Sequence, residues 1–342
     1  MTTSQISLKA KLLLVLFGTV FGVIILIVTF QFIPLRSKGT EFGSIDEIRK
    51  AMLSDNAPEA GELDSNQSIS LRGIVTPHQN DRIIYTLRPN LDLRFVRANV
   101  KTNSCGMRSP ERPIAKPLNT YRIALLGDSF AFGWGVEEKE TFAHRLEENL
   151  NRLTKGSPRV EVLNFGVPGY STFQEVALFE EMGLDFKPDA VLVYFVQNDF
   201  GMPFFIRSID GSGGILSSLK FVQLGRQLFQ PQEMDQKINE MGLDPNHALR
   251  DLSKIAQQNG LPVMLVINPR ADWQQDLKKL WGIKKDIGIH ILNLRDPLME
   301  IISRRKINET DLTLSYDPHP SPLRHAILGD ILTPYFISSL NK

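Results

Sequence analysis

The hydrophobic residues of this chain are distributed in three zones. The first is an almost unbroken apolar run, Leu12–Ile33, which follows a short polar tail. Residues 34–80 are rich in polar side chains, and after residue 80 short apolar runs alternate with amphipathic stretches. Because each pattern suits a different environment, the zones predict a membrane segment, a linker and a folded part.

The apolar run predicts an uncleaved transmembrane helix. A helix needs about 20 apolar residues to cross the hydrocarbon core. The core of a signal peptide has roughly 7 to 15 residues and ends at a small-residue cleavage site, which is missing after Ile33. We therefore expect residues 1–11 to be a tail, residues 12–33 a single-pass anchor in the cell membrane, and residues 34–80 a stalk. Basic residues flank both ends of the run, and the short tail favours an extracytoplasmic position, periplasmic or on the outer face, for the rest of the chain.

After residue 80 the pattern predicts an α/β fold. In an extension over residues 81–120, Leu91, Leu93 and Phe95 alternate with polar residues as in a half-buried strand. From residue 121, strand-like apolar runs alternate with helical segments. The predicted strands are Arg122–Leu126, Val160–Asn164, Ala190–Phe195, Pro262–Ile267 and Ile289–Leu294, and the predicted helices are Glu140–Thr154, Thr172–Leu184, Pro245–Asn259, Trp273–Lys285 and Pro322–Leu340.

This alternation predicts an open, doubly wound parallel sheet in a domain over residues 121–342. The third and fourth predicted strands are nearly continuous apolar runs, typical of strands that are covered on both faces. One insertion, residues 200–241, is longer than a usual connection and carries many Phe and Leu residues. It is either a lid over a site or a packed helical decoration.

Composition and charge narrow the function classes. The net charge of +1, without a basic tract, predicts no nucleic-acid partner. The only cysteine, Cys105, excludes an intrachain disulfide and a thiolate metal cluster. None of the six histidines has a companion at metal-ligand spacing, so we predict no metal.

Polar residues suited to acyl transfer follow the predicted strands. In doubly wound sheets, sites form beyond the carboxyl ends of the strands. Ser129 follows the first predicted strand, while Asp317 and His319 share a loop just before the last helix. A serine hydroxyl is weakly nucleophilic until a base takes its proton. We therefore predict Ser129 as nucleophile, His319 as base and Asp317 as the carboxylate that orients the imidazole.

The loops after the second and third strands offer donors for an oxyanion hole. Gly169 presents a backbone N–H without a side chain in the way, and Asn198 presents a side-chain amide. Considered one at a time, Gly169 could simply be a turn glycine, Asn198 a strand-end cap and Ser129 a turn residue, each without a catalytic role. Ala131 occupies the second glycine position of a Gly-x-Ser-x-Gly elbow, which argues against the common α/β-hydrolase fold.

Four sequence blocks, in order, resemble those of the SGNH (GDSL) hydrolases, and the chain looks like a membrane-anchored member. The blocks are Gly127-Asp128-Ser129-Phe130, Asn164-Phe165-Gly166-Val167-Pro168-Gly169, Gln197-Asn198-Asp199 and Asp317-Pro318-His319-Pro320. The resemblance implies a flavodoxin-like three-layer fold. It also implies that Ser129 is the nucleophile, that the N–H groups of Ser129 and Gly169 join Asn198 in the oxyanion hole, and that His319 is the base.

The chain departs from the family pattern at two places. Val196 stands where the third block usually has glycine, and a single residue separates Asp317 from His319, where two are common. Upstream, the motif Thr102-Asn103-Ser104-x-Gly106-x-Arg108 is similar to a segment that precedes the hydrolase domain in extracytoplasmic members. We expect this segment to pack on the edge of the domain.

The resemblance implies a serine esterase that needs no cofactor, and the predicted anchor places this esterase outside the cytoplasm, at the cell envelope. Its expected substrates are acyl esters, chiefly acetyl esters, on carbohydrate or lipid of the cell envelope. Two alternatives remain: an O-acetyltransferase that uses the same residues on polysaccharide, and a catalytically inactive binding module. The residues leave the acyl-chain length, the natural substrate and the oligomeric state open.

Overall fold

The computed structural model describes residues 71–200, 244–269 and 288–340, together with a few positions between 18 and 22 and between 274 and 280. Most of the predicted anchor 12–33, most of the stalk 34–80, nearly all of the insertion 200–241 and most of the predicted helix 273–285 lie outside the described residues. Within the described part of the chain, no helix combines the length and the apolar composition that a membrane span needs.

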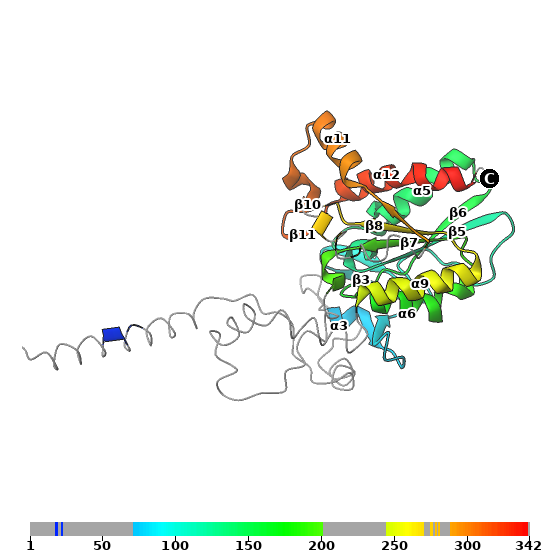
Figure 1. Ribbon diagram of the computed structural model, residues 1–342, viewed down its shortest axis with the longest axis horizontal. Coiled ribbons are helices and arrows are strands. Elements are labelled where there is room, and N and C mark those ends of the chain that lie inside the picture. The colour runs from blue at the N-terminus through cyan, green and yellow to red at the C-terminus, as the bar shows by residue number, and fades with distance from the viewer. Residues whose placement is uncertain are drawn as a thin grey trace, which may run out of the picture.

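A five-stranded parallel sheet forms the centre of the molecule (Figure 1). Each of the five predicted strands is present, with ends that differ from the prediction by two residues at most. The strands are β5 (Thr120–Gly127), β6 (Arg159–Asn164), β7 (Ala190–Phe195), β8 (Val263–Ile267) and β9 (Ile289–Leu292). Their spatial order, β6-β5-β7-β8-β9, is the flavodoxin-like order and confirms the predicted parallel α/β sheet.

Helices cover both faces of the sheet. α5 (Phe142–Thr154) and α12 (Pro322–Leu340) lie on one face, and α6 (Thr172–Glu181) and α9 (Pro245–Asn259) lie on the other (Figure 1). Successive side chains of a strand point to opposite faces, so each strand serves both cores. In β7, Val191 and Val193 belong to the core under α6 and α9, whereas Leu192 belongs to the core under α5 and α12.

Local signals set the helix boundaries. α5 starts two residues later than predicted because Thr141 is its N-cap and accepts the His144 N–H, after a separate 3-10 turn, η1 (Glu138–Glu140). α6 is shorter than predicted because Gly183–Phe186 forms a 3-10 turn, η2. α11 (Arg295–Arg305) was not predicted, since only Leu298 and Ile302 of this helix are buried.

The residues before the central sheet form two small antiparallel sheets. After α3 (Leu71–Ile74), β1 (Val75–Pro77) pairs with β2 (Tyr85–Leu87), and β3 (Asp92–Phe95) pairs with β4 (Ala98–Lys101). The single strand predicted around Leu91–Val100 is therefore a hairpin. The buried positions are odd-numbered up to Phe95 and even-numbered from Ala98, because a two-residue turn at Val96 and Arg97 shifts the alternation.

The extension and the central sheet share one hydrophobic core. Ile74, Tyr85 and Phe95 are buried in the same cluster as Ala124 and Leu126 of β5. α3 and β1 lie inside the segment that the sequence assigned to a stalk, so the part of that segment from Leu71 onward is folded. The extension is part of the same folded unit.

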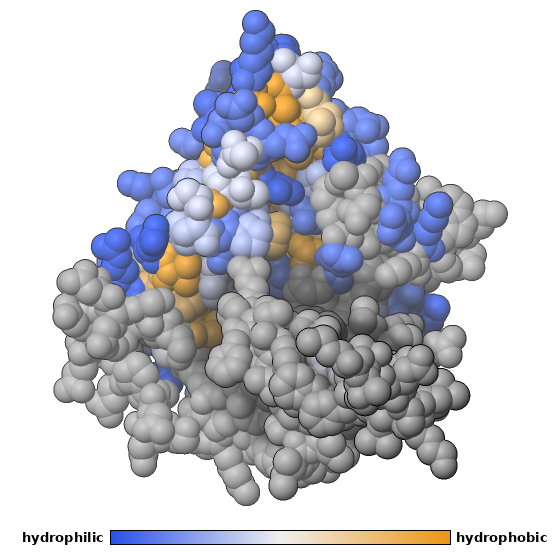
Figure 2. All heavy atoms as spheres, turned by 90° about the vertical axis from the view of Figure 1, so that its left-hand side faces the viewer, coloured by the Kyte–Doolittle hydropathy of each residue, from blue (hydrophilic) through white to orange (hydrophobic). Residues whose placement is uncertain are grey.

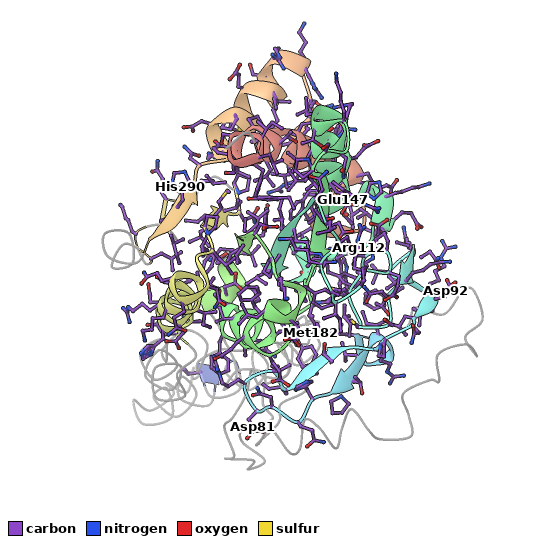
Figure 3. All side chains as sticks on the ribbon, turned by 90° about the vertical axis from the view of Figure 1, so that its right-hand side faces the viewer. Asp81, Asp92, Arg112, Glu147, Met182 and His290 are labelled. Carbon is purple, nitrogen blue, oxygen red and sulfur yellow. The ribbon has the colours of Figure 1, made fainter. Side chains whose placement is uncertain are left out.

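Buried ion pairs fasten the connecting segment 109–119 at the amino ends of the strands. Arg112 donates to both carboxylate oxygens of Glu147 on α5, at 2.6 and 2.9 Å, and Figure 3 shows these two residues side by side. Arg122 of β5, with none of its surface exposed, donates to Glu161 at 2.9 Å and to carbonyl oxygens of the connecting segment. The carboxyl ends of the strands are left for the site.

Candidate active site

The predicted nucleophile lies where β5 turns directly into a one-turn helix, α4 (Ser129–Phe132). Asp128 is the N-cap of α4 and accepts the Phe130 N–H at 2.9 Å. Its second oxygen lies 3.2 Å from Ser129 Oγ. Ser129 is 8% exposed, so its hydroxyl lies in a largely dry surrounding at the end of the sheet.

His319 lies on a short strand rather than on a loop. β11 (Asp317–Pro320) pairs with β10 (Thr313–Leu314), at the left-hand end of the sheet in Figure 1. His319 Nε2 is 2.8 Å from Ser129 Oγ, and His319 Nδ1 hydrogen bonds to Asp317 Oδ1. The same carboxylate oxygen accepts the His319 backbone N–H at 3.0 Å. The structure thus brings the three predicted residues into one Ser–His–Asp chain of hydrogen bonds.

The pKa of the Asp317 carboxyl lies below its ordinary value. Partial burial by itself raises this pKa, but the hydrogen bonds from the His319 ring and backbone outweigh that effect. The carboxylate therefore stays ionised at neutral pH. An ionised carboxylate at Nδ1 holds that proton in place and leaves Nε2 facing the serine as a proton acceptor.

Two aromatic rings fix the plane of the imidazole. Trp134 stacks on His319, with ring centroids 5.1 Å apart and planes 21° apart. Phe130 approaches at a tilt, with centroids 5.4 Å apart. Rings at these distances restrict the rotation of the histidine and remove water from around it.

The loops that carry the two other predicted residues flank the end of β5. β6 and β7 are the two neighbours of β5 in the sheet. Gly169 follows β6 in a turn with φ +81°, and its N–H, like that of Ser129, has no acceptor among the described residues. Asn198 lies in η3 (Gln197–Phe200), directly after β7, and its side chain is outside the described part of the structure. The backbone positions are compatible with an oxyanion hole at Ser129.

Contacts that the sequence did not predict hold the β6 loop against α4. Asn164 donates from its side chain to the Ala131 carbonyl at 2.8 Å and accepts the Gly166 N–H at 2.9 Å. A Cβ on Gly166 would lie 2.5 Å from the backbone nitrogen of Phe132, so only glycine allows this approach. Tyr85 of the extension donates to the Pro168 carbonyl at 3.0 Å and pins the same loop from outside.

Arg108 of the upstream motif holds the segment that carries Trp134. The guanidinium is 1% exposed and donates to the carbonyl oxygens of Phe132, Gly133 and Val136. It also lies over the Phe132 ring at 4.7 Å. Burial lowers the pKa of Arg108 to about 10, so the group remains charged at neutral pH. We expected the motif to pack on the edge of the domain. The structure shows more than that, because Arg108 contacts the segment that carries Trp134, which stacks on His319.

Two further features of the described part of the chain concern possible metal-ligand clusters and cavities. No cluster of three or more His, Cys, Asp or Glu side chains in it is arranged to hold a metal ion. A cavity of about 500 Å³ is lined by Val263, His290 and Tyr335, among others, at the amino ends of β8 and β9. It therefore lies at the end of the sheet opposite Ser129.

The comparisons agree with the geometry. Residues 125–290 match the model of the GDSL-like Lipase/Acylhydrolase family, a range that includes Ser129, Gly169 and Asn198 and ends before Asp317. The curated proteins contain no match to this chain.

Several solved structures are similar to the described fold. The psychrotrophic esterase EstA from Pseudoalteromonas sp. is 17% identical over 66% of this chain and 100% of its own, with a TM-score of 0.43. The lipase/acylhydrolase from Enterococcus faecalis is 17% identical over 64% and 96%, with a TM-score of 0.40. The acetyl xylan esterase AlAXEase is 14% identical over 63% and 98%, with a TM-score of 0.43. These likenesses are too distant to assign a substrate.

Because the family match covers the first three of the four blocks, residues 125–290 form a GDSL-like lipase/acylhydrolase domain, and the enzyme class of that domain is ester hydrolase.

Proposed function

We propose that this protein is a serine esterase that removes acyl groups, chiefly acetyl groups, from carbohydrate or lipid esters through an acyl-enzyme. The observation that carries the proposal is the 2.8 Å contact between Ser129 Oγ and His319 Nε2, with Asp317 on the opposite ring nitrogen. A base within hydrogen-bond distance of the hydroxyl, itself oriented by a third group, is the arrangement that activates a serine.

In the first half of the reaction, His319 Nε2 takes the proton of Ser129 while Oγ attacks the ester carbonyl carbon. The carbonyl oxygen becomes an oxyanion, for which the N–H groups of Ser129 and Gly169 and the side chain of Asn198 are the proposed donors. The C–O bond to the alcohol then breaks, and the imidazolium gives its proton to the departing alkoxide. An acyl group remains on Ser129.

In the second half, a water molecule replaces the alcohol. His319 takes a proton from this water as its oxygen attacks the acyl carbon, and Oγ leaves and recovers the proton. The products are a carboxylic acid and the free enzyme. An O-acetyltransferase would differ only in the acceptor, because a sugar hydroxyl would take the place of water.

The location forms part of the proposal. The apolar run Leu12–Ile33 supports a single-pass anchor, with the hydrolase domain extracytoplasmic at the cell membrane. Esters on envelope carbohydrate or lipid are then the substrates within reach. Added protease acting on spheroplasts tests the orientation, since it should digest the domain from outside and should leave it intact if the domain is cytoplasmic.

Hydrolysis of p-nitrophenyl acetate tests the activity. We expect Ser129→Ala to lower kcat by about 10³-fold or more, because no nucleophile remains. Ser303→Ala on the exposed face of α11 is the matched control and should leave the rate unchanged. A fluorophosphonate probe should label the wild type and fail on Ser129→Ala. Full activity of Ser129→Ala would rule out the proposal, and acetyl groups recovered on an added oligosaccharide instead of as acetate would indicate a transferase.

A further inference from the structure

The turn of the β3–β4 hairpin lies directly against the residue before Asp317. The Tyr316 hydroxyl is 3.3 Å from the carbonyl oxygens of both Val96 and Gly135 and donates to them. The Arg97 guanidinium lies over the Tyr316 ring, 4.1 Å from its centroid. Three segments that are distant in sequence therefore meet beside the Ser–His–Asp chain.

The backbone has positive φ values on both sides of the contact between the hairpin turn and Tyr316. Val96 and Arg97 have φ values of +46° and +68°, which a two-residue hairpin turn requires and which Asn and Gly adopt most readily. A β-branched residue in this region is strained, and such strain is typical of functional sites. Across the contact, Gly135 has φ +74°, and a Cβ there would lie 2.8 Å from the Tyr316 hydroxyl. The turn thus keeps Arg97 on the ring at a cost in backbone free energy.

Arg97 carries a charge that nothing in the described part of the chain neutralises. The side chain is exposed and lies over the Tyr316 ring, and it forms no ion pair with any residue that the structure describes. Among the cations of the extension, Arg82 is paired with Glu180 at 2.7 Å and Lys101 with Asp92 at 2.8 Å, whereas Arg94 on β3 is exposed and, like Arg97, has no ion pair within the described part of the chain. The carboxylate of Glu137, which contacts this hairpin, accepts the backbone N–H of Asn99 at 3.0 Å. The N–H fork of Arg97 is therefore available, and its geometry suits a carboxylate or a phosphate.

The distance along the chain sets the reach of this group. Tyr316 precedes His319 by three residues, which span about 10 Å at most. Because the Tyr316 and Arg97 side chains add to this backbone span, an anion bound at Arg97 would lie on the alcohol part of the ester, within about two or three sugar or glycerol units of the ester group. The Tyr316 ring, 39% exposed, offers an apolar edge beside it.

We propose that Arg97, held on Tyr316, forms an anion subsite that selects acyl esters whose alcohol part carries a carboxylate or a phosphate. This inference rests on the proposed esterase function and narrows its substrate class to acidic carbohydrate or anionic lipid. A guanidinium that only fastened the hairpin to the Tyr316 ring would affect charged and neutral esters equally.

Steady-state hydrolysis by the full chain separates these roles. The substrates are an acetylated oligouronate, the methyl ester of the same compound as its neutral match, and an acetylated glycerol phosphate. Arg97→Gln keeps the backbone conformation and removes the charge, Arg97→Lys keeps the charge without the fork, and Arg94→Gln removes another exposed charge of the same hairpin.

We expect Arg97→Gln to raise KM about tenfold for at least one of the two anionic esters, with kcat unchanged and no effect on the methyl ester. Arg97→Lys should fall in between, Arg94→Gln should match the wild type, and the anion preferred identifies the natural group. Equal changes for the oligouronate and its methyl ester, or no change with either anion, would refute the subsite. If the wild type hydrolyses none of these esters in a way that depends on Ser129, the esterase function itself is refuted.

Discussion

Asp317 and His319 are separated by one residue, and the strand geometry of β11 explains how this spacing serves the site. Side chains two apart on a strand point to the same side, so the carboxylate and the imidazole lie next to each other. The sequence placed both residues on a loop, where the spacing lowered the expectation for Asp317. The sequence could not predict the pairing with β10, because that partner strand has only two residues, Thr313 and Leu314, and so shows no strand pattern.

Replacing Asp317 by Asn should lower kcat for p-nitrophenyl acetate by about 10²- to 10⁴-fold with little change in KM. An asparagine amide no longer holds the Nδ1 proton, so the ring loses the tautomer that accepts from Ser129. Asp311→Asn, at an exposed position of the preceding 3-10 turn η7 (Glu309–Leu312), is the control. A loss below tenfold would mean that the two rings on His319 suffice to orient it.

His325 shows how a residue that looked unremarkable in the sequence gains a defined role from burial. It has no exposed surface, accepts the Phe142 N–H at 3.2 Å through Nδ1 and stacks on the Phe142 ring. Burial, followed by the nearby positive charges of Arg108 and Arg324, lowers the pKa of His325 to about 3. The His325 side chain is therefore neutral in the folded protein, and the main cause is its burial on the inner face of α12.

The depressed pKa of His325 predicts a loss of stability in mild acid. Below about pH 6.5 the unfolded chain binds a proton that the folded chain does not, so the unfolding free energy should fall by about 1.4 kcal/mol per pH unit towards pH 3 from this group. Urea unfolding at pH 7 and pH 5 should show a smaller difference for His325→Gln than for the wild type. His247→Gln, an exposed residue at the start of α9, should keep the wild-type difference. Identical differences in all three proteins would contradict the assignment.

Among the secondary-structure elements, the long apolar strands were predictable and the small ones were not. β7 begins at Ala190, where its apolar run begins, and ends at Phe195, one residue before the run does, because a strand covered on both faces needs no polar position. The β3–β4 hairpin was missed although its signal was present, namely the change of parity after Phe95. Turns of this kind usually contain Asn or Gly, and Val96-Arg97 has neither.

Arg108 links the extension to the segment after α4, and no sequence pattern predicts this link. Its partners are backbone carbonyls of the segment after α4, and a carbonyl is common to every residue. The motif around it signalled only a turn. The structure shows that this buried guanidinium supports the segment carrying Trp134, which in turn stacks on His319.

Replacing Arg108 by Met should therefore reduce both stability and activity. Each buried carbonyl left without a donor costs about 1–3 kcal/mol, so we expect the unfolding free energy to fall by about 3 kcal/mol or more. The rate with p-nitrophenyl acetate should fall as well, because Trp134 loses its support. Arg94→Met, on the exposed side of β3, serves as control in urea unfolding and in the assay. A change below about 1 kcal/mol would show that the carbonyls find other partners.

For the whole molecule, the sequence predicted the fold class and the order of the blocks, because strand alternation and strand-end motifs are local signals. It did not predict that the extension completes the core. Tyr85 and Phe95 each belong to a short strand whose apolar positions are few, and only the fold shows that they are buried in the same core as Ala124 and Leu126 of β5. The predicted boundary between linker and extension at residue 80 likewise falls within the described fold, since Ile74 is fully buried.

This shared core makes a prediction about where the enzyme can be shortened. The family match begins at residue 125, and β5 begins at Thr120, so Asn119 is the start that the hydrolase domain alone would suggest. A chain starting there loses Arg108 and the Tyr85–Pro168 contact, and it opens the hydrophobic core that the extension shares with β5. We expect this chain to aggregate or to unfold without a cooperative transition, because large apolar patches at a surface drive association. A chain starting at Leu71 keeps these contacts and should unfold cooperatively and hydrolyse p-nitrophenyl acetate. Equal thermal midpoints for the two shortened chains would show that the extension is an accessory rather than part of the folded unit.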